Sequence, residues 1–278
     1  MILDGKTLKQ KILDENKKII NDNNYKIKLA IILIGNNEAS KIYIKNKELA
    51  CNYVGIKVDK YLLDEETKEE DLIKLINKLN SDNEVTGIIL QSPVPRQIDF
   101  NKCSGLIDAK KDVDGFTKEN IYNLYLGVDT ILPCTVKGII RLLEDYKIKI
   151  SGANVVIVGR GNIVGHPLGL AMLNKDATVT IAHSKTKNLK DITKNADILI
   201  SATGIPHLIK EDMVKENATI IDVGVSKIDG KIVGDVDFLN VSKKASYITP
   251  NPGGVGPMTV AMIIDNLIFI YERGINNG

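Results

Sequence analysis

Several residue types are scarce in this chain of 278 residues, which has no tryptophan, 4 phenylalanines, 3 cysteines and 3 histidines. The cysteines are odd in number and widely spaced, which argues against a disulfide framework and against a Cys-x-x-Cys metal site. The histidines do not show the HExxH spacing or another ligand spacing. We therefore expect neither a structural nor a catalytic metal.

The chain also lacks an excess of charge of one sign and any long apolar run. Its 37 basic and 35 acidic side chains are interspersed and leave a net charge of +2, without a basic stripe that carries aromatic residues. The apolar run over 29–34 is far too short to span a bilayer, and the first residues, MILDGKTLKQK, lack the apolar region of a signal peptide. We expect a cytoplasmic protein with no nucleic-acid partner and no membrane partner.

Apolar runs alternate with segments of helical periodicity along the whole chain, which is typical of an α/β protein. The first part predicts helices over 7–20, 39–54 and 68–79, and strands over 28–34, 56–62 and 85–91. Gly55 is expected to end the second of these helices. The stretch over 92–116 is rich in proline and glycine, and its length suggests a function. A linker between two domains is expected around 117–120.

The second part of the chain predicts one more α/β unit. Its expected helices cover 136–146, 164–173 and 260–271, and its expected strands cover 155–158, 178–182, 197–202, 218–223 and 245–249. Asp229 and Gly230 have the Asp-Gly centre of a tight hairpin. We therefore expect a two-domain α/β fold, with an N-terminal α/β domain over 1–118 and a Rossmann-type domain over 119–278. The last helix, at about 258–274, is expected to return to the first domain.

Residues 155–173 predict a buried strand, a glycine turn and a helix, the arrangement in which dinucleotides bind. Gly159, Gly161 and Gly165 have the spacing G-x-G-x-x-x-G, which is one residue longer than the usual fingerprint. A helix that begins near Val164 would direct its free N–H groups and its positive dipole end toward a pyrophosphate. The alternative interpretation is an ordinary turn.

The strand over 178–182 is followed by His183, Ser184 and Lys185, where NAD-binding folds usually carry an acidic residue for the ribose hydroxyls. Arg160 lies within the glycine turn. A guanidinium offers paired donors to a phosphate and a serine hydroxyl offers another, so these residues favour NADP. The alternative is a solvated basic loop.

Tyr43 and Lys47 lie four residues apart in a predicted helix and so project from the same face. A phenol beside a lysine can orient the ammonium group for proton transfer. Taken alone, however, the pair fits an ordinary amphipathic surface better, with the lysine stem on apolar surface.

Two further sets of polar residues are candidates for ligand binding. Gln91 ends the strand over 85–91, at the edge where open α/β sheets bind ligands. The alternative is that Gln91 is an ordinary polar residue that caps the strand. Asp112 and Asp114 have the spacing of a calcium loop but lack the later ligands of an EF-hand. One carboxylate could instead hold an amidine-like heterocycle edge through two parallel hydrogen bonds, and a plain acidic turn is the alternative.

The segment from Pro252 to Pro257 is dense in glycine and proline and allows backbone to approach a flat ligand closely. Thr259 is expected to cap the final helix. A rigid hinge is the competing interpretation of the segment.

Taken together, these segments resemble the methylenetetrahydrofolate dehydrogenase/methenyltetrahydrofolate cyclohydrolase family, in its order and spacing and over nearly the whole chain. The matching motifs are GNNEASKIYIKNKELACNYVGI, GIILQSPVP, KDVDGF, PCTVKG, VGRGNIVGHP, HSKT, ADILISATG, IDVGV, GDVDF and TPNPGGVGPMTVAM.

The resemblance implies NADP-dependent oxidation of 5,10-methylenetetrahydrofolate, followed by hydrolysis of the methenyl product to 10-formyltetrahydrofolate. It implies an N-terminal folate-binding catalytic domain, a C-terminal NADP-binding domain, a homodimer joined through the cofactor domains, and no metal. The catalytic and folate-binding residues implied by the family are Lys47, Tyr43, Gln91 and Asp114, with Pro252, Gly253, Gly254, Val255 and Gly256 lining the folate site. Those implied for the coenzyme are Thr135, Gly159, Arg160, Gly161, Ile163, Val164, His183, Ser184 and Val225.

Four positions depart from the family pattern. Gly161 stands where the family usually has serine, which removes one hydroxyl from the phosphate turn. Val136, Ser92 and Asn251 replace a proline, a leucine and a valine, and these changes affect packing or the folate wall. Three other functions remain open from the residues: a dehydrogenase for another small substrate, a non-catalytic binding protein, and an interaction protein that uses the hairpin at Asp229 and Gly230.

Overall fold

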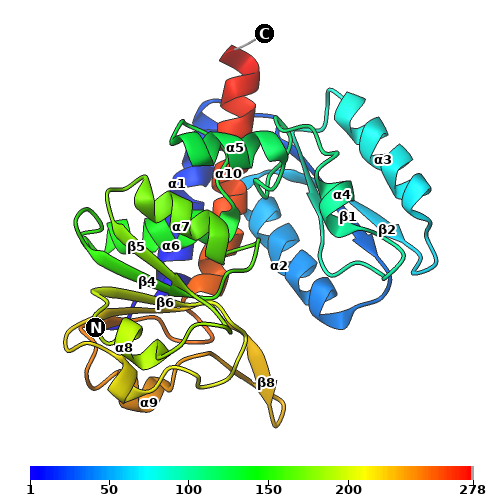
Figure 1. Ribbon diagram of the computed structural model, residues 1–278. Helices are drawn as coiled ribbons and strands as arrows, with labels where there is room; N and C mark the ends of the chain where they lie inside the picture. Colours follow the sequence, from blue (N-terminus) through cyan, green and yellow to red (C-terminus); the bar gives the residue numbers. More distant parts are fainter. Residues whose placement is uncertain (277–278) are drawn as a thin grey trace. The chain divides into compact units, whose positions relative to one another are not determined.

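The computed structural model describes residues 1–276, except for the side chains of residues 39 and 276, and its contacts divide the chain into two compact units (Figure 1). The small-sheet unit contains residues 10–134 and the chain from 260 onward, and the large-sheet unit contains residues 1–9 and 135–259. The division falls inside the first and last helices, α1 (Gly5–Asp22) and α10 (Val255–Asn276), so each of these helices contributes to both units.

The small-sheet unit is built on three parallel strands in the order β2-β1-β3. These are β1 (Lys28–Ile34), β2 (Lys57–Leu63) and β3 (Gly87–Leu90), and its helices besides α1 and α10 are α2 (Glu38–Val54), α3 (Glu69–Ser81), α4 (Phe100–Ser104) and α5 (Lys118–Leu126). Gly55 ends α2 in the left-handed conformation, with φ of 91°, as expected from the sequence. All three predicted strands and all three predicted helices of this part form.

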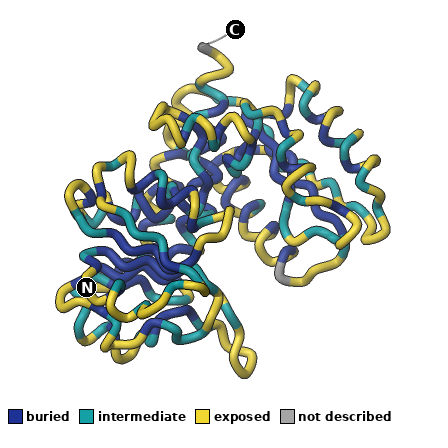
Figure 2. The backbone as a smooth tube through the Cα atoms, viewed as in Figure 1, coloured by how far each residue is buried: buried dark blue, intermediate teal, exposed yellow. Residues whose placement is uncertain are grey.

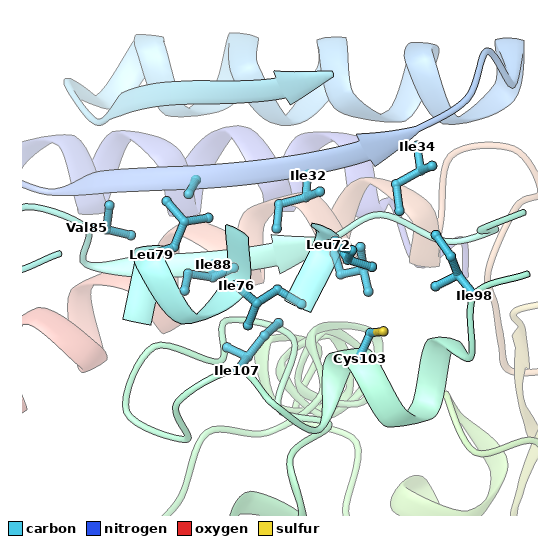
Figure 3. Close-up of a cluster of buried hydrophobic side chains, with 12 residues drawn as sticks. Ile32, Ile34, Leu72, Ile76, Leu79, Val85, Ile88, Ile98, Cys103 and Ile107 are labelled. Atoms are coloured by element: carbon cyan, nitrogen blue, oxygen red, sulfur yellow. The ribbon is translucent and has the colours of Figure 1, made fainter. Parts of the chain in front are cut away.

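One face of this sheet carries a compact hydrophobic cluster (Figure 3). Leu72, Ile76 and Leu79 recur at helical spacing along α3 and lie fully buried against the sheet. Ile32 and Ile88 face them from β1 and β3, because alternate residues of a strand point to the same side. Each such side chain contributes about 1.5–3 kcal/mol through burial, so this face fixes the sheet rigidly.

The large-sheet unit contains five parallel strands in the order β10-β7-β6-β4-β5, and the middle strands β4, β6 and β7 are its most buried part (Figure 2). They are β4 (Asn154–Val158), β5 (Thr178–Ala182), β6 (Ile198–Ser201), β7 (Thr219–Asp222) and β10 (Tyr247–Ile248). The helical elements are α6 (Cys134–Asp145), α7 (Gly165–Leu173), α8 (Leu189–Thr193), α9 (Phe238–Val241) and the short 3-10 turn η1 (Glu211–Met213). β5 lies on one side of β4 and β6 on the other, so the strand order reverses beside β4, where open α/β sheets bind ligands.

The hairpin expected at Asp229 and Gly230 forms between β8 (Ser226–Ile228) and β9 (Lys231–Val233). Both turn residues have positive φ, 49° and 76°, as a tight two-residue turn between twisted strands requires.

Two predictions about local structure are wrong. The linker expected around 117–120 is instead the start of α5. The final helix begins at Val255, so Thr259 is an interior residue of α10 whose Oγ1 bonds to the carbonyl of Val255, and it does not cap the helix.

α10 is long and apolar enough to cross a membrane by length and composition alone. However, 61% of its apolar window is buried inside the structure, as in the core helix of a folded domain. The length of this helix is therefore weak evidence for a membrane span.

Candidate active site and coenzyme site

Lys47 lies on the buried face of α2 rather than on its solvent face. Asn37 caps this helix by accepting a hydrogen bond from the backbone N–H of Ser40 at 3.0 Å. The buried positions of the helix include Ile44, Lys47 and Cys51, which recur at helical spacing, and Lys47 is only 8% exposed. The fold therefore places an ammonium group where the helical pattern would otherwise place an apolar side chain.

The Lys47 ammonium donates a hydrogen bond to Oε1 of Gln91 at 2.9 Å. Gln91 directly follows β3, and its own Nε2 donates to the carbonyl of Ser92 at 2.7 Å, which fixes both ends of the amide. Within residues 1–276, no carboxylate lies within ion-pair distance of Lys47. The interpretation of Lys47 as an ordinary surface lysine is therefore wrong: it is a buried ammonium held by a neutral partner.

Cys51 lies one turn further along α2 and is fully buried. Burial raises the pKa of its thiol to about 12, although the nearby charge of Lys47 acts in the opposite direction. The thiol therefore stays protonated near neutral pH and does not compete with Lys47 as a proton acceptor.

Tyr43 and Asp114 lie on the same unit as Lys47. Tyr43 precedes Lys47 by one helical turn and is 46% exposed, so its ring is available to a ligand. Ile88 of β3 forms a parallel bridge with Asp112, so residue 114 lies level with the carboxyl end of β3, where Gln91 follows. Asp114 is half-buried at that edge.

Asp112 has a structural role that the sequence did not reveal. It is 3% exposed and accepts hydrogen bonds from the backbone N–H of Gly115 at 2.9 Å and of Thr117 at 2.7 Å, and from Asn120 at 3.1 Å. These three donors occupy both of its oxygens. Asp112 therefore closes the turn that presents Asp114, and the calcium-loop interpretation is wrong for it.

The glycine-rich segment before α10 belongs to the large-sheet unit. Pro252, Gly253 and Gly254 form a turn, and Val255 and Gly256 are the first residues of the helix. A Cβ on Gly254 would lie 2.6 Å from the Cβ of Thr249, so the turn leaves no room for a side chain there.

Two of the three glycines after β4 are sterically required. A Cβ on Gly159, whose φ is 122°, would lie 2.4 Å from the carbonyl oxygen of Ala202, and one on Gly165 would lie 2.3 Å from the carbonyl oxygen of Gly159. A Cβ on Gly161 would meet nothing within 4 Å. The turn is thus a tight backbone cradle before the N-terminus of α7, as the dinucleotide motif requires.

The candidate phosphate ligands are exposed around this cradle. Arg160 and Ser184 are exposed, Ile163 is 48% exposed and Val164 immediately precedes α7. His183 anchors the turn after β5: its backbone N–H bonds to Thr186 Oγ1 at 2.8 Å and its Nδ1 accepts from the N–H of Lys185 at 3.2 Å.

Two remaining predicted coenzyme residues lie elsewhere in the same unit. Val225 follows β7 and is 52% exposed, and Thr135 lies in the first turn of α6 with its hydroxyl 3.1 Å from that of Thr259.

Sequence reasoning missed two buried aspartates in the large-sheet unit, Asp222 and Asp235, which are 4% and 0% exposed. They belong to the segments IDVGV and GDVDF, and for Asp222 the signal that could have revealed it is an acidic residue directly after an apolar strand run.

Comparison with known proteins identifies the family. Residues 3–114 match the tetrahydrofolate dehydrogenase/cyclohydrolase catalytic domain, and residues 133–274 match the NAD(P)-binding domain of the same family. The chain is 51% identical to the bifunctional protein FolD of Clostridium novyi over 269 residues, which cover 95% of this chain and 97% of that protein. It is also 51% identical to the FolD of Aquifex aeolicus, over 98% of this chain and 96% of that protein.

Solved structures agree with this match. The bifunctional FolD dehydrogenase/cyclohydrolase of Campylobacter jejuni superimposes with a TM-score of 0.96 at 45% identity, over 99% of both chains. The Trypanosoma brucei enzyme, solved with NADP and an inhibitor, superimposes with a TM-score of 0.94 at 33% identity, over 99% of this chain and 98% of that one. The chain belongs to the tetrahydrofolate dehydrogenase/cyclohydrolase family.

Proposed function

We propose that Lys47 is the proton-transfer residue of the hydrolysis, the second of the two reactions that this chain catalyses. The chain is a bifunctional enzyme that oxidises 5,10-methylenetetrahydrofolate with NADP and hydrolyses the resulting methenyl compound to 10-formyltetrahydrofolate. The observation that carries the proposal is the buried ammonium of Lys47, held at 2.9 Å by the Gln91 amide.

The residues of the large-sheet unit fit a dinucleotide. The cradle of Gly159 and Gly165 admits no side chain, which is what close approach of a pyrophosphate to backbone requires. Arg160 and Ser184 would hold the extra phosphate of NADP, and Gly161, Ile163, Val164, His183, Val225 and Thr135 would complete the site. Bound NADP would supply the acceptor for the hydride that leaves the folate methylene carbon.

In the second reaction, water attacks the methenyl carbon, so a C–O bond forms and the water loses a proton. The tetrahedral adduct then collapses: its hydroxyl loses a proton as the formyl C=O bond forms, the bond from that carbon to one folate nitrogen breaks, and this nitrogen takes up a proton. Lys47 can mediate these transfers because a neutral amide, not a carboxylate, holds its ammonium group. Gln91 positions Lys47, Tyr43 orients the Lys47 ammonium group, and Asp114 anchors the pterin.

The test replaces Lys47 by methionine, with Lys45→Met as the matched control on the same helix, since Lys45 is exposed. Loss of a general acid–base group typically lowers a rate by about 10²–10⁴-fold, so Lys47→Met is expected to lose at least a hundredfold in cyclohydrolase kcat. The control is expected to keep its activity within about twofold, as surface changes usually do. A Lys47→Met variant that hydrolyses the methenyl compound at the wild-type rate would remove Lys47 from the mechanism.

We also propose a cytoplasmic homodimer joined through its cofactor domains. The family resemblance supports the dimer, and three free, buried cysteines suit a reducing compartment. Light scattering coupled to gel filtration tests the dimer, and cell fractionation tests the location. A monomer across the concentration range of the assay would contradict the first part.

A further inference from the structure

Two aspartates without a cationic partner lie buried where strands β6 and β7 end. Asp222 is the last residue of β7, and Asp235 lies two residues beyond β9. Within the described residues, neither carboxylate forms an ion pair with a lysine, arginine or histidine. Burying a carboxylate without such a partner is costly unless hydrogen bonds hold it, so the bonds of this pair reveal its role.

Asp235 fixes the turn that follows β6. Its Oδ2 accepts hydrogen bonds from Ser201 Oγ at 2.8 Å, from the backbone N–H of Thr203 at 2.7 Å and from Thr203 Oγ1 at 2.9 Å. This turn contains Ala202, whose carbonyl oxygen packs so closely on Gly159 that a Cβ there would lie 2.4 Å from it. Asp235 therefore holds one wall of the glycine cradle in place.

The second oxygen of Asp235 faces the turn that follows β7. A Cβ on Gly224 would lie 1.8 Å from Asp235 Oδ1, and this oxygen has no hydrogen-bond partner among the described residues. Val225 comes next in the chain and is exposed, and Ser226 Oγ then donates to the carbonyl of Gly204 at 2.7 Å. The Asp235 carboxylate therefore lies between the turn after β6 and the turn after β7. The hydrogen bond from Ser226 to Gly204 links these two turns directly.

Asp222 in turn holds Asp235. Its Oδ1 accepts from the backbone N–H of Asp235 at 2.9 Å, and its Oδ2 accepts from that of Val236 at 3.1 Å. A Cβ on Gly234 would lie 1.9 Å from Asp222 Oδ2, so the loop must be glycine at this point to approach the carboxylate.

We infer that Asp235 is a positioning residue for coenzyme binding, which acts by fixing the turns after β6 and β7, and that Asp222 acts through Asp235. The inference rests on the proposed coenzyme site at this sheet edge. Asp235 itself does not contact the coenzyme. It holds the backbone of Ala202 in place beside Gly159, and it holds the backbone of Gly224 in place before Val225.

The test compares Asp235→Ala and Asp235→Asn with wild type, and uses Asp212→Asn as a control because Asp212 is an exposed carboxylate of the same unit. The dissociation constant for NADP is measured by calorimetry, and cyclohydrolase activity is measured without coenzyme. Asp235→Ala is expected to raise the dissociation constant at least tenfold while cyclohydrolase kcat stays within twofold. Asp235→Asn keeps an oxygen for Ser201 and Thr203, so its dissociation constant is expected to fall between those of wild type and the alanine variant.

An Asp235→Ala variant that binds NADP like wild type would overturn the inference, and so would equal losses in NADP binding and cyclohydrolase activity. If the alanine variant does not fold, Asp235→Asn decides by the same two readouts: weaker binding with intact hydrolysis supports the role, and unchanged binding refutes it. A wild-type protein that does not bind NADP would instead refute the proposed function.

Discussion

At the residue scale, the three glycines of the coenzyme turn are not equivalent. Gly159 and Gly165 each lack the space for a Cβ, whereas Gly161 faces open space and has no positive φ. The sequence predicted all three as one motif, because spacing alone does not distinguish a glycine that is required from one that is tolerated. Only the neighbouring carbonyl groups of Gly159 and Ala202 reveal the difference.

This difference predicts opposite results for two substitutions. Gly161→Ser adds a hydroxyl near the proposed phosphate site without a clash, so NADP affinity is expected to rise by about 0.5–1.5 kcal/mol, or roughly two- to tenfold. Gly165→Ala places a Cβ 2.3 Å from the carbonyl oxygen of Gly159, so the turn must shift and affinity is expected to fall at least tenfold. Calorimetric titration with NADP measures both. Weaker binding by Gly161→Ser would contradict this geometry of the turn.

A second residue-scale prediction concerns Asp222. Burial raises the pKa of its carboxyl from 3.8 to about 6, against the lowering effect of hydrogen bonds from the N–H groups of Asp235 and Val236. Because the folded protein holds this proton more tightly than the unfolded chain, the stabilising contribution is complete below about pH 4. It is lost as the pH rises through 6.

Carbon-13 NMR of the labelled carboxyl carbon of Asp222 measures this titration directly. The expected midpoint lies near pH 6, and a midpoint at or below that of an ordinary aspartate would contradict the account. Asp212, which is exposed and whose pKa is lowered chiefly by its hydrogen bond with Lys190, provides the internal reference.

At the scale of elements, the helices of 12 or more residues and every strand of the two sheets could be predicted from apolar runs and helical periodicity, and α7 could be predicted from the glycine turn before it. The other short helices could not. α5 shows why: Tyr122, Tyr125 and Leu126 are exposed, whereas Asn120 is buried. These three apolar side chains therefore lie outside the buried face of α5, which Asn120 shares with Leu124. Asn120 donates a hydrogen bond to Asp112 and accepts one from Thr130. Hydrophobic periodicity predicts which apolar residues are buried. It does not predict a buried polar residue whose hydrogen bonds are formed with residues elsewhere in the chain.

The same limit applies to the candidate active site. The sequence indicated Lys47 and Gln91 separately. An ordinary surface pair with Tyr43 was the preferable interpretation for Lys47, and a polar strand cap was the preferable one for Gln91, until the fold joined α2 to the end of β3. Asp112 and Asp114 are indistinguishable in sequence, yet the first is a buried acceptor for the turn and the second is presented at its edge.

This distinction within the 112–117 turn yields an element-scale prediction. Asp112→Ala leaves the N–H groups of Gly115 and Thr117 without their acceptor, at about 1–3 kcal/mol for each buried donor, so the free energy of unfolding is expected to fall by at least about 2 kcal/mol. Asp114→Ala is expected to change stability by less than about 0.5 kcal/mol, because the hydrogen bonds that close the turn go to Asp112, and to weaken folate binding instead. Denaturant unfolding and folate titration separate the two effects, and a large loss of stability in Asp114→Ala would show that it too is structural.

At the scale of the whole molecule, neither of the two compact units is one continuous segment of the chain. The sequence predicted domains over 1–118 and 119–278, with the last helix, at about 258–274, returning to the first domain. Contacts do group the chain from 260 onward with 10–134, and they also group residues 1–9 with 135–259, which the sequence did not predict. The first residues join the large sheet: Ile2 bridges Ile248 of β10, and Leu3 donates its N–H to the carbonyl of Ile248 at 2.9 Å. No local pattern indicates a pairing of residues so far apart, because periodicity describes neighbours along the chain only.

The central claim is that one chain carries out both the oxidation and the hydrolysis, and a single coupled assay tests it. Purified protein is mixed with 5,10-methylenetetrahydrofolate and NADP, and the formation of NADPH and of 10-formyltetrahydrofolate is followed together. We expect both products to form in wild type, and Lys47→Met to lose at least a hundredfold in the formyl product. NADPH formation without any formyl product in wild type, or no NADPH at all, would contradict the account.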